Sequence, residues 1–167
     1  MREQVLQNEI PQLKQVISDL YNEVAAPPAI TVVVVNKRIT QRFFVQEGKR
    51  LVNPPSGCII DKELVENDGS SAAGVFDFYL TPANTTQGCV LPTHFYVAMN
   101  QSRINKIELE HLTFALCHFY FNWAGPIKVP APCQYAHKIA EFYTRVGLEN
   151  HDKQRKGGKK PSDKREA

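Results

Sequence analysis

Residues 121–138 read FNWAGPIKVPAPCQYAHK and contain a helix end, an extended connection and a helix start. The glycine and proline at 125 and 126 end a helix that the apolar pattern predicts over residues 106–121. Prolines then keep residues 127–132 extended. Pro132 stands at the favoured first-turn position of the next helix, which we predict from residue 132 to 146.

The N-terminal part of the chain predicts a helix followed by a strand. Apolar residues recur at three- and four-residue steps over residues 3–24, which is typical of an amphipathic helix, and Pro11 predicts a kink or a first turn in it. Residues 30–35 are almost all β-branched and apolar on both faces, which favours a central, parallel strand covered on both sides. A helix leading into such a strand predicts an α/β layer architecture.

Further short strands are expected between these elements. We predict them near residues 40–45, 58–60, 76–80 and 93–99. Residues 66–74 contain Asn-Asp-Gly-Ser-Ser and predict a flexible connection.

The positive charge of the chain is concentrated at its C-terminal end. The net charge is +3, but residues 150–167 carry seven Lys/Arg and three Asp/Glu, which leaves a net of −1 for the rest. We therefore predict one domain over residues 1–148 and a disordered basic tail over residues 149–167. The bulk charge does not indicate what the domain binds.

Composition and motifs exclude several classes of protein. No apolar run is long enough to span a membrane, and Met1-Arg-Glu-Gln does not begin a signal peptide. The four cysteines form no C-x-x-C pair, so a zinc knuckle and a disulfide framework are disfavoured and reduced thiols are expected. The sequence contains no G-x-G-x-x-G, P-loop, G-x-S-x-G or H-E-x-x-H motif.

One candidate metal site lies on the last predicted helix. Cys133, His137 and Glu141 are spaced i, i+4 and i+8 and therefore share one face. Imidazole and carboxylate groups bind divalent metals. The alternative is that Cys133 is a small core residue and Glu141 a solvated charge.

A second candidate site is a set of cations near strand ends. Ligands gather at the strand ends of an open α/β sheet, where converging cations could neutralise phosphates. The members are Lys37, Arg38, Arg42, His94, Arg103 and Lys128. The alternative is scattered surface charge.

Two further features have open interpretations. Asp77 faces away from Phe76 and Phe78 in its strand and is either catalytic or structural. The aromatic side chains of residues 120–123 could stack on bases or pack in the core.

The stretch 121–138 closely resembles the end of the PIWI domain of Argonaute/Piwi proteins, and the Piwi subfamily most. Further blocks agree in order over residues 1–146, and they are Glu9–Leu13, Ile30–Arg38, Pro55–Gly57 with Asp61, Phe76–Leu80, Gln87-Gly88, Pro92–His94 and Leu112–His118. The resemblance implies the C-terminal portion of an RNase H-like α/β fold. The implied partners are a small guide RNA, its complementary target RNA and silencing-complex proteins, with no membrane.

In that family, three carboxylates and a histidine hold two divalent metals that cleave the target. The family histidine falls on His137, whereas Cys133 and Glu141 match no ligand. The family's carboxylates are expected upstream of the stretch that matches Met1. One histidine cannot hold two Mg²⁺ or Mn²⁺ ions, which prefer oxygen ligands. We therefore expect no cleavage and no cofactor for this chain alone.

The resemblance also assigns RNA contacts. Guide-backbone contacts carry over to Arg38, His94 and Arg103, and more loosely to Lys128, Gln134 and Tyr120. Lys37 and Arg42, from the strand-end cations, complete the predicted RNA contacts. Argonautes usually place an arginine where this chain has Phe142. We expect RNA binding in small-RNA silencing, in the cytoplasm or alternatively in the nucleus or RNA granules. The other functions considered are a slicing endonuclease, if the chain is part of a longer one, and a protein-interaction module.

Overall fold

The computed structural model describes residues 2–21, 26–66 and 74–157. The chain divides into two compact units, residues 1–131 and residues 132–167. The elements of the first unit are α1 (Arg2–Gln4), η1 (Val5–Glu9), α2 (Ile10–Tyr21), β1 (Thr31–Asn36), β2 (Val45–Glu47), β3 (Arg50–Val52), β4 (Cys58–Ile60), β5 (Phe76–Thr81), β6 (Thr93–Asn100) and α3 (Lys106–Leu116). Helix α4 (Ala131–Gly157) forms the described part of the second.

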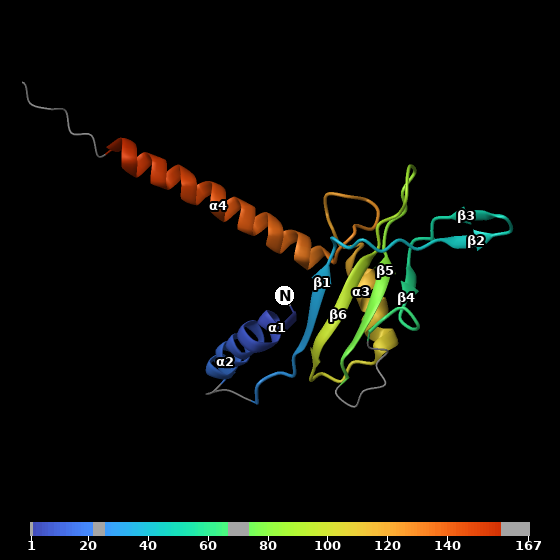
Figure 1. Ribbon diagram of the computed structural model, residues 1–167. Coiled ribbons are helices and arrows are strands. Elements are labelled where there is room, and N and C mark those ends of the chain that lie inside the picture. The colour runs from blue at the N-terminus through green and yellow to red at the C-terminus, as the bar shows by residue number, and fades with distance from the viewer. Residues whose placement is uncertain (1, 22–25, 67–73, 158–167) are drawn as a thin grey trace, which may run out of the picture. The chain divides into compact units, whose positions relative to one another are not determined.

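The first unit is built on a four-stranded antiparallel sheet with the order β1-β6-β5-β4 (Figure 1). One face carries the phenylalanines of β5 and β6 and packs against α3 through Leu109 and Cys117. The other face packs Ala98 against Val5 and Ile10 of the N-terminal helix. The predicted α/β layers are therefore confirmed.

The strand predicted over residues 30–35 is β1, but its predicted central, parallel position is wrong. β1 pairs antiparallel with β6 and ends the described sheet on that side. Val33 and Val35 pack against one core cluster and Val32 and Val34 against the other. The run is apolar because both of its faces are covered, and this property does not reveal the position or direction of the strand.

The strand predicted near residues 40–45 is also wrong. Strand structure begins only at Val45, in the separate β2–β3 hairpin. Arg42 Nη1 donates to the carbonyls of Ile39 and Gln41 at 3.1 and 2.7 Å. Because a side chain satisfies these carbonyls, this segment does not need a partner strand.

The two predicted helices of this unit form, but several of the apolar residues in each are exposed rather than buried. The N-terminal helix contains a π-helical turn, η1, just before Pro11, and Val5 and Ile10 are its buried residues among those whose burial is described. Much of its predicted apolar stripe is exposed, as the side chains of Leu13, Val16 and Leu20 show. The segment expected around residues 22–25, like that at 67–73, lies outside the described residues.

Helix α3 does not turn all of its apolar residues inward. Leu109, Glu110 and Thr113 are buried, whereas Ile107 and Leu112 are exposed. Gly57, whose φ is +84°, lies close to α3, since a Cβ on this residue would lie 3.1 Å from the ring of Phe114. The helix ends at Leu116 rather than at residue 121 because the next amide groups bond three residues back, as Cys117 N does to Phe114 O at 3.0 Å.

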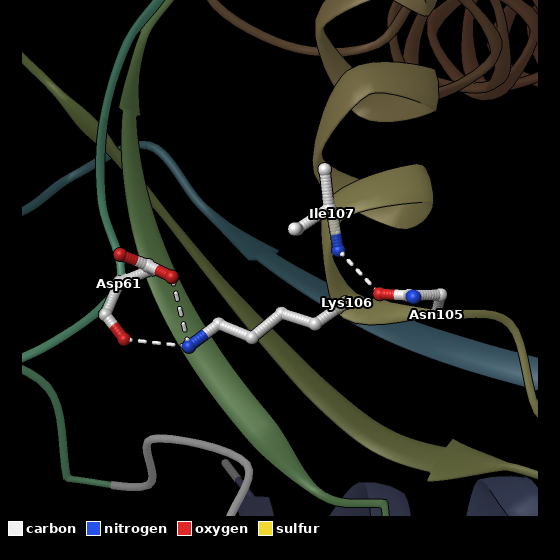
Figure 2. A network of polar contacts seen from close by, with 4 residues as sticks. All are labelled: Asp61, Asn105, Lys106 and Ile107. Atoms are coloured by element: carbon white, nitrogen blue, oxygen red, sulfur yellow. Dashed lines mark hydrogen bonds and ion pairs between the residues drawn. The ribbon is translucent and has the colours of Figure 1, made fainter.

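The start of α3 is capped and tied to the strand side of the unit (Figure 2). Asn105 Oδ1 accepts from the Ile107 amide at 3.1 Å, and Glu108 completes a capping box. Lys106 Nζ donates to the carbonyl and to the carboxylate of Asp61, at 2.7 and 3.0 Å.

We expect Asn105→Ala to lower the free energy of unfolding by about 1 kcal/mol, because two amide groups of the first turn lose their partner. Urea unfolding followed by circular dichroism measures the change. Asn105→Ser keeps an acceptor at the cap and should stay within about 0.5 kcal/mol of the parent. Equal losses in both variants would contradict a role for the cap.

Helix α4 begins where the sequence predicts and continues through Gly157, beyond the predicted boundary at residue 148. The helix thus includes residues 149–157, which the sequence assigns to the tail, and residues 158–167 lie outside the described part. None of the described helices is long and apolar enough to cross a membrane.

Candidate nucleic-acid interface

Lys37 and Arg38 directly follow β1, and both side chains are exposed. The Arg38 amide donates to Asn36 Oδ1 at 3.3 Å, which turns the chain as it leaves the strand. Asn36 is paired with His94. Both cations therefore lie at the end of the sheet where β6 begins.

Arg42 is brought to the same end by its neighbour in the sequence. The ring of Phe43 meets the ring of Tyr79 edge-on, with 5.2 Å between the centroids. Tyr79 is the register partner of His94 on β5. Among the described residues, Arg42 forms hydrogen bonds through Nη1 alone, and the exposed side chain leaves the rest of its guanidinium in solvent.

Lys128 joins this end through its backbone. The buried hydroxyl of Thr93 donates to the Lys128 carbonyl at 2.7 Å. Val129 and Ala131, which follow, are buried. The backbone is thus held at the start of β6 while the Lys128 side chain stays exposed.

His94 occupies the centre of the group and is almost buried. Its Nε2 lies 2.7 Å from Asp77 Oδ2, and its ring stacks on Tyr79 with 4.6 Å between centroids. Asp77 points away from the phenylalanine face, as its position in the strand predicts. The sequence alone does not identify His94 as the partner of Asp77, because this pair depends on the register of β5 and β6. We name the exposed cations and this histidine together the cation end: Lys37, Arg38, Arg42, His94 and Lys128.

Arg103 does not lie at the cation end. It follows β6 at the opposite end, beside Asn100, which pairs with Thr31. The six residue steps from His94 to Asn100 correspond to roughly 20 Å of strand. The predicted convergence of all six cations is therefore wrong for Arg103, because β6 separates it from the others. Its φ of +51° and its place in a cavity with Lys14 and Gln101 belong to that other end.

The aromatic residues after α3 are not core residues. Phe121 and Trp123 are 93% and 63% exposed, and Tyr120 is half-buried. The core-packing alternative is therefore wrong for Phe121 and Trp123. Their loop returns to the body through the amide of Ile127, which donates to the Cys117 carbonyl at 2.9 Å.

Gln134 and His137 lie on α4, in the other unit. Gln134 is half-buried and His137 is exposed. The spacing of Cys133, His137 and Glu141 along a continuous helix is confirmed, but Glu141 accepts from Arg145 Nη2 at 2.6 Å. Cys133 is exposed, so it is not a core residue.

A metal ion needs several converging ligands, and His137 does not belong to such a group. In the described parts of the chain, no three His, Cys, Asp or Glu side chains lie close enough to hold a metal. These residues do not fit the two-metal centre of Mg²⁺ or Mn²⁺ that the resemblance implies.

The Piwi domain model matches residues 1–146 of the chain. Piwi-like protein 1 of Gallus gallus is 43% identical over 136 residues, which cover 79% of this chain and 14% of that protein. Piwi-like protein Ago3 of Bombyx mori is 39% identical over 134 residues, or 80% of this chain and 14% of that protein. The chain thus spans about one seventh of these relatives.

Solved structures agree with the sequence comparisons. The crystal structure of Drosophila Piwi has a TM-score of 0.69 and 31% identity, covering 83% of this chain and 18% of that one. The C-terminal lobe of a budding yeast Argonaute has a TM-score of 0.67 at 23% identity, covering 81% and 28%, and supports the RNase H-like fold alone. This chain belongs to the Piwi domain family, and its fold corresponds to the C-terminal part of the RNase H-like PIWI domain.

Proposed function

We propose that this chain binds the sugar–phosphate backbone of RNA, as a guide strand or a guide–target duplex, in small-RNA silencing. The single observation that carries the proposal is the cation end. Four exposed cations, three from the connection between β1 and β2 and one from the segment before α4, lie there around one nearly buried histidine. Such a group recognises phosphates without reading bases, because it offers charge and hydrogen-bond donors to the backbone.

Family membership supports the same function. The relatives are Piwi-like proteins, and one structural neighbour, the Argonaute of Kluyveromyces polysporus, was solved with a guide RNA. Its TM-score is 0.66 at 22% identity, so it supports the fold, and the RNA is carried to this chain only as part of the proposal. We further propose complementary target RNA and silencing-complex proteins as partners, and the cytoplasm as the compartment.

Binding without cleavage is the proposed activity of this chain. His137 alone offers one nitrogen ligand, whereas metal-assisted hydrolysis of a phosphodiester requires ligands that fix the metal and orient the attacking water. Arg103, Tyr120 and Gln134 stay predicted contacts, and Arg103 would act from the far end of the sheet.

We expect Arg38→Ala with Lys128→Ala to weaken binding of a single-stranded RNA at least tenfold at 100 mM salt. Two lost phosphate contacts should also reduce the slope of log affinity against log salt by about 1.4. Fluorescence anisotropy with a 5′-labelled oligonucleotide measures both quantities, and a denaturing gel with added Mg²⁺ reports whether the RNA stays intact.

The matched control is Lys49→Ala with Lys62→Ala, which removes the same charge from the β2–β3 turn and from the segment after β4. This variant should keep the parent affinity within about twofold. Equal weakening by both double variants would mean that bulk charge, rather than the cation end, binds the RNA. Arg103→Ala tests separately whether the opposite end touches the same strand.

A further inference from the structure

We propose that Asp77 is a positioning residue of the cation end: its carboxylate holds Nε2 of His94, so that Nδ1 of the same ring donates to an RNA phosphate. The inference rests on the proposed function and deepens it. Asp77 is buried and cannot itself contact RNA, so its proposed role is to act through His94. The inference also predicts the protonation state of the His94 ring when that ring contacts RNA.

The bond between Asp77 and His94 defines the tautomer of the ring. Asp77 is 1% exposed, and its Oδ2 lies 2.7 Å from His94 Nε2. An ionised carboxylate can only accept a hydrogen bond, so Nε2 must carry the proton. The hydrogen bond therefore commits Nε2 to the interior of the protein.

Stacking and strand pairing also fix the orientation of the His94 ring. Tyr79 stacks on the imidazole with 30° between the planes, and Phe43 packs edge-on against Tyr79. Strand pairing places Asn36 on one side of His94 and Tyr79 on the other. Because the hydrogen bond to Asp77, the stacking on Tyr79 and the strand pairing already hold His94 in place, its side chain loses little conformational entropy on binding a ligand.

The remaining nitrogen, Nδ1, is the group available for a ligand. No hydrogen bond recorded among the described residues uses it, and the side chain keeps 11% of its surface exposed. Arg38 and Lys128 enter the cation end on the segments bonded to Asn36 and Thr93, which lie beside this ring.

Contact with a phosphate requires a second proton on the ring. Phosphate oxygens accept hydrogen bonds, and a neutral ring that donates through Nε2 has only a lone pair at Nδ1. The ring that touches RNA therefore carries both protons, and its charge lies between two anions, the Asp77 carboxylate and the phosphate. Without Asp77, a nearly buried imidazolium would lack its internal partner, which is costly.

A double-mutant cycle tests whether Asp77 acts through His94. We measure the affinity of a 5′-phosphorylated single-stranded RNA for the full chain and for Asp77→Asn, His94→Gln and the double variant. Each single variant should weaken binding about tenfold, as expected for a lost hydrogen bond to a charged group. The double variant should also lose about tenfold, because both changes remove one contact. A hundredfold loss in the double variant, or no loss in either single one, would overturn the proposal.

Nitrogen chemical shifts of the His94 ring provide a readout that a purely structural role would not move. In the free chain Nε2 should be protonated and bonded, and added RNA should bring Nδ1 into the protonated range as well. The signals are assigned by their absence in His94→Gln. An Nδ1 shift that RNA does not change would overturn the proposal, even if Asp77→Asn fails to fold.

Failure of this inference differs from failure of the proposed function. If Arg38→Ala with Lys128→Ala weakens binding while the cycle at Asp77 and His94 is additive, the cation end stands and the positioning role falls. If the parent chain binds no RNA, both proposals fall.

Discussion

Phe78→Ala is expected to lower the free energy of unfolding by about 3–5 kcal/mol, the largest effect of any substitution considered. Phe78 is fully buried in the sheet and stacks on Phe95 with 5.1 Å between ring centroids and on Phe76 with 6.2 Å. Removing its ring forfeits the burial of the ring and leaves a cavity between the sheet and α3. Because a domain is stable by only about 5–15 kcal/mol, this variant is close to unfolding at room temperature.

The matched control is Phe121→Ala, which deletes the same ring from a residue that is 93% exposed. Its effect should stay within about 0.5 kcal/mol. Urea unfolding curves of the two variants and the parent measure the difference. If the two substitutions cost the same free energy, Phe78 is not in the core that the fold requires. Should Phe78→Ala not fold, Phe78→Leu should give a measurable transition at lower urea.

Glu110→Gln is expected to raise the free energy of unfolding by about 2–3 kcal/mol at pH 8 and to leave it unchanged at pH 4. Glu110 is 5% exposed on the inner side of α3, and its Oε1 has no hydrogen-bond partner in the described structure. Burial raises the pKa of this carboxyl from its usual 4.5 to about 7, the nearby Asp61 carboxylate adds to the rise, and Lys106 opposes it. Lys106 compensates little because its ammonium group is bonded to Asp61 (Figure 2).

The direction of the pH effect follows from proton binding. Between pH 4.5 and 7 the folded chain holds a proton on Glu110 that the unfolded chain releases. The contribution of this group to stability therefore falls as the pH rises through that range and stays low above it. A glutamine at position 110 is neutral at every pH, so the variant does not lose this part of the free energy of unfolding as the pH rises.

The control for this prediction is Glu9→Gln, an exposed carboxyl on η1. It should change stability by less than 0.5 kcal/mol at either pH. Chemical unfolding at pH 4, 6 and 8 measures all three proteins. A Glu110→Gln variant that is less stable than the parent at pH 8 would show that the carboxylate is satisfied in the folded state.

Local sequence signals located most of the elements. The β-branched run at residues 31–36, the phenylalanine strand at 76–81 and the helix beginning at Lys106 all form where they are predicted. Strand direction and order were predicted wrongly, because they depend on pairing between segments far apart in the chain, such as Thr31 with Asn100. The inward face of α3 also depends on tertiary packing, because Leu109, Glu110 and Thr113 are buried whereas the apolar Ile107 and Leu112 are exposed.

In the candidate site, too, the sequence indicates which residues take part, and the tertiary structure decides how they are arranged. Residue type and resemblance were enough to select Arg38, His94 and Lys128. Neither could show that Asp77 is the partner of His94, nor that Arg103 lies at the other end of β6.

The sequence alone determined the family, the helix and strand segments and the choice of cationic side chains, because these depend on residue type and near-neighbour spacing. Only the tertiary structure decided which of those cations lie together and which acid supports them. Register and packing bring residues that are 17 positions apart, as Asp77 and His94 are, within 2.7 Å, whereas roughly 20 Å of extended strand separates His94 from Arg103.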